Sequence, residues 1–344
     1  MLYVLLALLS AALFGAATPL SKALLSSFDA FQLAGLLYLG AAIGASGLAF
    51  HKGPYTLPWR MDRRNRIRLI GAVFFGGVLA PLLLLLGLEA SSAASVSLWL
   101  PLELVATAIL GTVLFRDPLG RFGWIGMAGV LAAGILLSIG EQAAGISAGL
   151  LVMGACACWG FDNNFTALID GITPAQSTFW KGLVAGSVNL TIGLITRDFS
   201  GTAATTVAAI GVGMICYGAS IVLYITAAQN IGATRGQMFF AASPFFGVVL
   251  SVAFLSEAIT IIQLAASAIL AGSLFLVFRD KHEHEHTHED QEQEHEHVHR
   301  HDDGHHGHEH LEAVSGRHTH KHSHKQMTHR HPHWPDLHHR HGHL

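Results

Sequence analysis

Apolar residues fill the first 280 positions in blocks that are separated by short polar segments. A block of about 20 mostly apolar residues is long enough to cross the hydrocarbon core of a bilayer as an α-helix. The pattern therefore predicts an all-α membrane protein with ten transmembrane helices. The predicted helix cores are residues 2–21, 30–50, 69–88, 93–114, 123–140, 147–167, 174–195, 206–227, 236–255 and 259–278.

Lysine and arginine are distributed unevenly among the connections. Six of them follow the second predicted helix, where the single acid is Asp62. Arg116 and Arg235 fall on the same side if the helices alternate in direction, whereas the other side holds only Lys22 and Arg197. Cytoplasmic loops carry such an excess of basic residues. The asymmetry predicts a multi-pass protein of a bacterial-type inner cell membrane with both termini in the cytoplasm.

The two halves of the apolar region resemble each other. The segment 13–17 matches 158–162, and the segment 114–117 matches 254–257. Five helices per half is an odd number, so the second copy is expected to be inverted relative to the first. Inverted repeats build transporters that alternate access around a site near the membrane midplane. The predicted domains are a first five-helix repeat at residues 1–140, a second at 146–280 and a tail at 281–344.

One short stretch places polar chemistry inside apolar sequence. Asp162, Asn163 and Asn164 follow Trp159 in the sixth predicted helix, and Lys181 lies in the seventh. A charge in hydrocarbon costs at least a few kcal/mol, so such residues usually face a cavity or one another. Asp162 and Lys181 lie at similar distances from the intervening turn, which predicts similar depth and allows them to pair. The pair either locks a helical hairpin or forms part of a polar site facing a central cavity.

Other residues of the spans are candidates for the same site. Glu103 lies near the middle of the fourth predicted helix, where a carboxylate can accept a proton or cation or can simply make an interhelical hydrogen bond. Amides such as Asn189 can orient a substrate or hold helices together. Trp159 and Tyr217 can line a pocket, although aromatic residues of spans also serve as interfacial anchors or core.

Histidines dominate the tail, which holds 23 of the 24 in the chain. Its apolar content is too low for a core, so we expect disorder. Imidazole is a common ligand for zinc, nickel, copper and cobalt, although the tail can also be a solvated, pH-responsive segment without a metal role. The candidate metal ligands are His282, His284, His286, His288, His295, His297 and His299.

Several short motifs resemble the drug/metabolite transporter superfamily, EamA type. Phe14 and Trp159 each precede a glycine late in the first helix of a half, and the acids Asp117 and Glu257 end the fourth and ninth helices. A run of small residues leads to a Pro-Phe pair at Pro244, as that family often shows in its ninth helix. Two departures are Leu104, where the family frequently has proline, and the Asp at position 117 in place of the usual Glu.

The resemblance implies a secondary transporter, not an enzyme, that exports or exchanges a small metabolite, amino acid or drug. It also places Lys181 where EamA-type sequences often carry a basic residue. The expected partners are the lipid bilayer, a small-molecule substrate and divalent metal ions, without nucleic acid, and a homodimer is left open. No cofactor is required. Two alternatives are a transition-metal efflux transporter that uses the tail as a collector, and a metal-responsive membrane sensor without transport.

Overall fold

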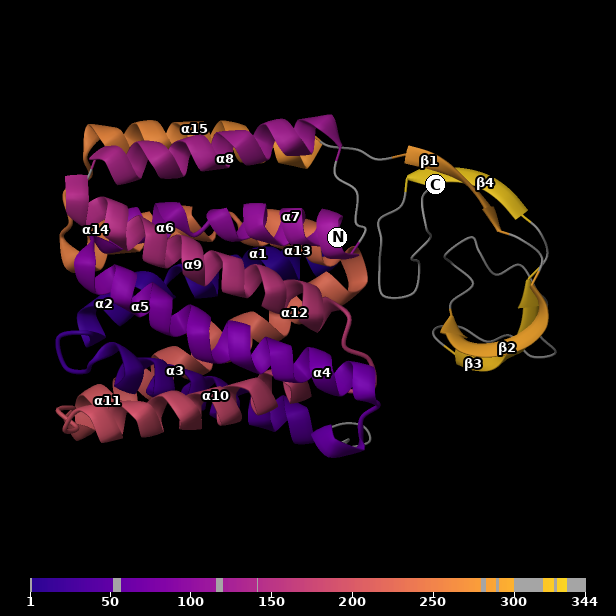
Figure 1. The fold of residues 1–344 in the computed structure, drawn as a ribbon, viewed down its shortest axis with the longest axis horizontal. Helices are drawn as coiled ribbons and strands as arrows, with labels where there is room; N and C mark the ends of the chain where they lie inside the picture. The colour runs from indigo at the N-terminus through magenta and orange to yellow at the C-terminus, as the bar shows by residue number, and fades with distance from the viewer. Residues whose placement is uncertain are drawn as a thin grey trace. The chain divides into compact units, whose positions relative to one another are not determined.

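The computed structural model describes residues 2–51, 57–115, 120–140, 142–279, 283–288, 291–299, 318–324 and 327–332. The chain divides into two compact units, a helical unit that contains residues 2–279 and a second unit within residues 281–333. The helices of the first unit run roughly along one common direction and pack in layers (Figure 1).

The helical elements follow one another without intervening strands in the described part of residues 2–279. They are α1 (Leu2–Gly15), α2 (Ala17–Leu24), α3 (Ala30–His51), η1 (Pro58–Arg60), α4 (Arg63–Gly71), η2 (Ala72–Leu79), α5 (Ala80–Ala90), α6 (Ala93–Trp99), α7 (Leu102–Phe115), α8 (Arg121–Gly140), α9 (Gln142–Ala167), α10 (Pro174–Thr196), α11 (Ala203–Val212), η3 (Gly213–Ala219), α12 (Ser220–Ile231), α13 (Ala233–Phe240), α14 (Ser243–Leu255) and α15 (Ile261–Arg279).

Nine helical runs in the described residues are long and apolar enough to cross a membrane, and Ile261–Val277 is a shorter apolar helix. These ten runs, numbered here as spans 1 to 10, correspond one by one to the ten predicted cores. The all-helical fold expected from the hydrophobic pattern is therefore confirmed. Large apolar side chains such as Ile135 and Phe275 are more than half exposed on the outer helices, as a surface that faces lipid requires.

Capping residues set the start of two spans that matter for the site. Asp62 caps α4, because its carboxylate accepts hydrogen bonds from the backbone N–H groups of Arg64 and Asn65. These bonds, above all those from Asn65, hold the pKa of the Asp62 carboxyl below its usual range. Thr173 opens α10 with a reciprocal pair of hydrogen bonds to Gln176, a capping box.

Spans 4 and 9 are each interrupted in the middle. Span 4 consists of α6 and α7 with a break at Leu100 and Pro101, and span 9 consists of α13 and α14 with a break at Ala241 and Ala242. Proline lacks an N–H donor and crowds the preceding turn, so Pro101 and Pro244 explain why both helices restart.

Spans 3 and 8 each contain a π-helical segment. These segments are η2 in span 3 and η3 in span 8, and their first residues lie 141 positions apart. A π-helical turn is rare and often marks a functional site. Around η2, backbone carbonyl oxygens accept hydrogen bonds from side chains: Gly76 accepts from Tyr38 and Trp159, and Gly77 and Val78 accept from Asn189.

The helical core is built by contacts between spans that are distant in sequence. The helix α3 packs against α10 and η3, α9 packs against α5 and α7, and α8 lies beside α15 (Figure 1). Ser10 of α1 and Ser220 of α12 exchange hydrogen bonds, each hydroxyl reaching the other residue's carbonyl at 2.8 and 3.0 Å. Because both residues are fully buried, this contact fixes span 1 against span 8.

Hydrogen bonds to helix termini link several spans at one end of the bundle. Lys22 Nζ donates to the carbonyl oxygens of Leu88 and Ser91 at 2.6 and 2.9 Å. The carboxylate of Glu257 accepts from the first two backbone N–H groups of α6, both at 2.9 Å. These contacts join spans 1, 3 and 4 with the segment that follows span 9, at the end away from the basic segment around Arg63.

The described residues of the second unit form four strands in two antiparallel pairs. The strand β1 (Glu283–His288) pairs with β4 (Met327–Pro332), and β2 (Gln291–His299) pairs with β3 (His318–His324). In these segments histidine largely alternates with other residues, which matches the two-residue period of a strand.

Candidate functional site

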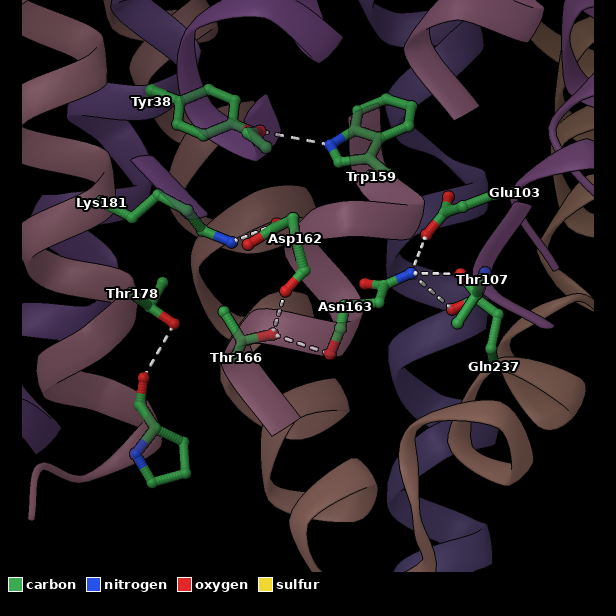
Figure 2. A network of polar contacts seen from close by, with 12 residues as sticks. Tyr38, Glu103, Thr107, Trp159, Asp162, Asn163, Thr166, Thr178, Lys181 and Gln237 are labelled. Atoms are coloured by element: carbon green, nitrogen blue, oxygen red, sulfur yellow. Dashed lines mark hydrogen bonds and ion pairs between the residues drawn. The ribbon is translucent and has the colours of Figure 1, made fainter. Parts of the chain in front are cut away.

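A buried ion pair lies at the centre of the helical unit. Lys181 Nζ is 2.6 Å from Asp162 Oδ2, and the two side chains are only 3% and 6% exposed. Asp162 belongs to α9 and Lys181 to α10, so the pair joins two consecutive antiparallel spans (Figure 2). The pairing predicted from their similar depth is present. Gly171, with a φ of 81°, lies in the connection between these helices, and a left-handed φ favours glycine.

Gly76 in η2 packs directly against this pair. A Cβ atom at position 76 would overlap the carboxylate of Asp162. The carbonyl oxygen of Gly76 also accepts hydrogen bonds from Tyr38 Oη at 2.5 Å and from Trp159 Nε1 at 3.2 Å. The π-helical segment therefore brings the backbone of span 3 against Asp162 while it orients two aromatic rings.

Glu103 joins the site through Asn163. Asn163 Nδ2 donates to Glu103 Oε1 at 2.7 Å and to Thr107 Oγ1 at 3.1 Å, and it lies 3.4 Å from Gln237 Oε1 (Figure 2). Glu103 is 4% exposed and stands at the start of α7, just after the break in span 4. Neighbouring positions in α9 thus carry the two polar clusters, because Asp162 faces Lys181 and Asn163 faces Glu103.

A pocket lies between these polar side chains and a set of aromatic rings. About 430 Å³ of space free of protein atoms lies within and in front of it, a volume that includes open solvent. The lining residues are Phe14, Tyr38, Glu103, Trp159, Asp162, Asn163, Thr166, Lys181, Ile221, Tyr224, Ile225 and Phe240.

The lining residues come from both halves of the chain. Phe14, Tyr38 and Glu103 belong to spans 1, 2 and 4, whereas the other lining residues belong to spans 6, 7, 8 and 9. The ring of Phe14 lies 5.8 Å from that of Trp159 and 5.1 Å from that of Phe240. The pocket therefore forms only when the two halves are assembled against each other.

Three residues proposed from the sequence lie elsewhere. Asn164 donates to the backbone carbonyl oxygens of Thr107 and Gly160 at 3.2 and 2.9 Å, so it joins α9 to α7. Tyr217 is fully buried and packs its ring 5.6 Å from those of Phe14 and Tyr38, behind the pocket lining. Asn189 donates to carbonyl oxygens of η2.

Sequence reasoning did not single out several residues of the site. Tyr38 and Phe240 are apolar-face aromatics of long spans, and Gln237 is a lone amide in a run of small residues. Gly76 carries no side chain to attract notice. For Gly76 one signal was available, since a glycine pair at Gly77 in an otherwise bulky run indicates a close approach of two backbones.

The prediction of metal binding depends on the histidines of the tail. Among the described residues there is no group of three or more His, Cys, Asp or Glu side chains that could hold a metal ion. His282 lies outside the described residues, and for the other six candidate ligands, in β1 and β2, the structure describes the backbone alone. Asp117, the acid expected to end span 4, also lies outside the described residues.

Comparison with known proteins gives the site its context. The model of the EamA-like transporter family matches residues 1–139 and, a second time, residues 146–279. These two matches cover most of the chain. The chain belongs to the EamA-like transporter family. Each match contains five of the ten spans, so this EamA-like protein is a multi-pass membrane protein of a family of transporters.

Individual relatives agree with this family. An uncharacterized transporter of Methanothermobacter thermautotrophicus is 26% identical over 230 residues, which cover 64% of this chain and 66% of the relative, just under two thirds of its length. A solved structure, described only as the crystal structure of a protein, matches with a TM-score of 0.60 and 17% identity over 80% of this chain and 96% of the other. The structural likeness shows the fold alone.

Proposed function

We propose that this EamA-like protein is a secondary active transporter that exports a small organic solute by alternating access, with coupling to or exchange for an ion. The observation that carries the proposal is the pocket lined by Glu103, Asp162 and Lys181 within membrane-spanning helices. Buried charges in a membrane protein mark substrate or ion paths. A purely structural ion pair would not account for a second carboxylate, Glu103, on the wall of the same pocket.

Two structural features support alternating access. The interrupted spans 4 and 9 provide mid-membrane breaks at which their halves can move separately, as discontinuous helices do in other transporters. The hydrogen bonds of Lys22 and Glu257 to helix termini link spans 1, 3 and 4 with the segment after span 9 at one end of the bundle. Such bonds can break and re-form without disturbing the apolar packing of the helices.

The basic residues support an orientation for this cycle. Arg63, Arg121 and Arg235 begin spans 3, 5 and 9, which all start at the same end of the bundle because consecutive spans alternate in direction. We place this end in the cytoplasm of a bacterial-type inner membrane, since cytoplasmic loops are enriched in Lys and Arg. The end near Lys22 then faces outward, and both termini lie inside.

A flux measurement tests the proposal. The purified full-length protein is reconstituted in liposomes loaded with a panel of organic solutes, and efflux is recorded with and without a pH gradient. We expect at least one solute to cross and Lys181→Met to reduce its flux at least about tenfold, a loss equivalent to about 1.4 kcal/mol.

The matched control is Glu89→Gln, which removes the charge of an exposed acid at the end of α5. This variant should retain wild-type flux. Absence of flux for every solute, or flux that survives Lys181→Met and Glu103→Gln unchanged, contradicts a transport site in this pocket. Reconstituted protein must be quantified in each case, so that lost flux is separated from lost protein.

A further inference from the structure

The charges that line the pocket do not balance. Glu103, Asp162 and Lys181 are the lining side chains that carry a full charge at neutral pH in water. The ammonium of Lys181 is already matched by Asp162, with 2.6 Å between Nζ and Oδ2. In the described part of the chain, Glu103 has only uncharged partners, of which Asn163 is the closest at 2.7 Å. When both carboxylates are ionised, the lining therefore holds one surplus negative charge.

The remaining walls of the pocket are rich in aromatic rings. Phe14, Tyr38, Trp159, Tyr224 and Phe240 all line it. Ring centroids lie 5.1 Å apart for both the Phe14–Phe240 and the Tyr224–Phe240 pairs. The face of an aromatic ring attracts a cation within about 6 Å of its centroid, and the attraction grows when water is excluded.

We propose that the pocket binds a small organic ammonium cation with an apolar body, and that this cation and a proton occupy Glu103 in turn. The inference rests on the proposed transport function and adds the chemical class of its substrate. Either occupant cancels the surplus charge of Glu103, so the pocket is neutral in both forms. Exchange of one for the other couples export of the cation to entry of a proton.

A ligand that carries its own carboxylate fits this pocket less well. To bind the carboxylate, Lys181 would have to leave Asp162, whose Oδ1 already has no hydrogen-bond partner in the described part of the chain. Leaving a buried charge without its partner is strongly unfavourable. A substrate carboxylate would also be a third negative group beside Glu103 and Asp162, which disfavours anions and, to a smaller degree, zwitterions.

The other titratable groups near Glu103 do not compete for this role. Asp162 and Lys181 neutralise each other, and phenol and thiol groups keep their protons at neutral pH. These neighbours come from four elements: Tyr38 of α3, Cys156 and Asp162 of α9, Lys181 of α10 and Tyr224 of α12. Glu103 is therefore the group whose proton can be exchanged without breaking an ion pair.

Three probes that share one apolar body and differ in charge test the proposal. They are phenethylamine, a cation, phenylalanine, a zwitterion, and 3-phenylpropionate, an anion. Binding of each to the purified full-length protein in detergent is measured by calorimetry at about pH 5.5 and about pH 8, where the amine stays protonated. We expect phenethylamine to bind at least about tenfold more tightly than the other two. Its affinity should rise with pH, by at most about tenfold per unit, because one proton leaves as the amine binds.

Glu103→Gln should weaken phenethylamine binding at least about tenfold and remove its pH dependence, whereas Glu89→Gln should change neither. The comparison of the three probes uses the unaltered protein, so the proposal can still be tested if the Glu103→Gln protein does not fold. Tighter binding of phenylalanine or 3-phenylpropionate, a pH-independent amine affinity, or no amine binding at about pH 8 overturns it.

Flux separates this inference from the function on which it rests. If a neutral or anionic solute crosses the membrane through a Lys181-dependent path while phenethylamine neither binds nor crosses, the transporter stands and the substrate class is wrong. If phenethylamine binds with the expected pH dependence but neither it nor any other solute crosses, the cation site stands and the transport function is wrong.

Discussion

Gly76 lies so close to Asp162 that the carboxylate occupies the space a Cβ atom at position 76 would need. The contact places a span 3 backbone carbonyl, an ion pair and two aromatic donors, Tyr38 and Trp159, within one small region of the bundle. Gly76 is therefore one of the residues that fix the geometry of the site, because no larger residue fits there without moving Asp162 or the backbone.

Gly76→Ala should impair transport more than its size suggests. The added methyl must displace the Asp162 carboxylate or the π-helical backbone, and overpacking of this kind typically costs about 1–3 kcal/mol. We expect flux to fall at least about tenfold and the thermal midpoint to decrease. Gly272→Ala is the control, because a Cβ at position 272 meets nothing within 4 Å. Equal behaviour of the two variants would show that the close packing at Gly76 is unimportant.

The ion pair predicts a difference between single and double substitutions. Lys181→Met leaves Asp162 as an unpaired buried charge, which typically costs about 3–5 kcal/mol, so membrane abundance should fall. Asp162→Asn combined with Lys181→Met removes both charges and should restore abundance, measured by fluorescence-detected gel filtration. Flux should remain lost in the double variant. Restored flux would mean that the pair only holds the hairpin together.

Labelling of introduced cysteines tests the orientation. In a protein whose three natural cysteines are replaced by serine, we expect a cysteine at Arg64 to react with an impermeant reagent only after the membrane is opened. A cysteine at Asp198, which is exposed at the opposite end, should react in intact cells. The reverse pattern would invert the topology.

Removal of the tail distinguishes export of an organic solute from export of a transition metal that the tail collects. Truncation after Arg279 leaves all ten spans in place, so flux of an organic solute should be unchanged. The full-length protein should bind several zinc or nickel ions at neutral pH, and the truncated protein should not. Binding should weaken near about pH 5, because protons compete with the metal for imidazole. A selective loss of metal efflux on truncation would instead favour a metal exporter with the tail as collector.

The sequence predicted the fold because spanning helices leave a strong signal. Each needs a long apolar run, and the ten predicted cores coincide with ten helical runs of the structure to within a few residues at the ends. The sequence also carries the cause of the breaks in spans 4 and 9, because Pro101 and Pro244 cannot continue the backbone hydrogen-bond pattern. The π-helical segments η2 and η3 have no comparable signal in the sequence, because a shift in the backbone hydrogen-bond pattern does not require a particular residue type.

The site was predictable where burial of a polar group is costly. Asp162, Lys181 and Glu103 were conspicuous in apolar sequence, and the depth of two of them on neighbouring helices was enough to expect a pair. The aromatic lining was not predictable, because the sequence around Tyr38 or Phe240 does not indicate whether the ring faces lipid, the helical core or the pocket. Only the packing of distant spans decides between these surroundings.

The positions of η2 and η3 bear on the history of the chain. A π-helical segment accommodates one more residue than the same length of regular helix, and the two segments fall in the third span of each match to the family model. One insertion in an ancestral five-helix unit, followed by duplication, accounts for both. Insertion after duplication would require two separate events at matching places. The matching places of η2 and η3 are therefore what a single insertion before duplication would leave.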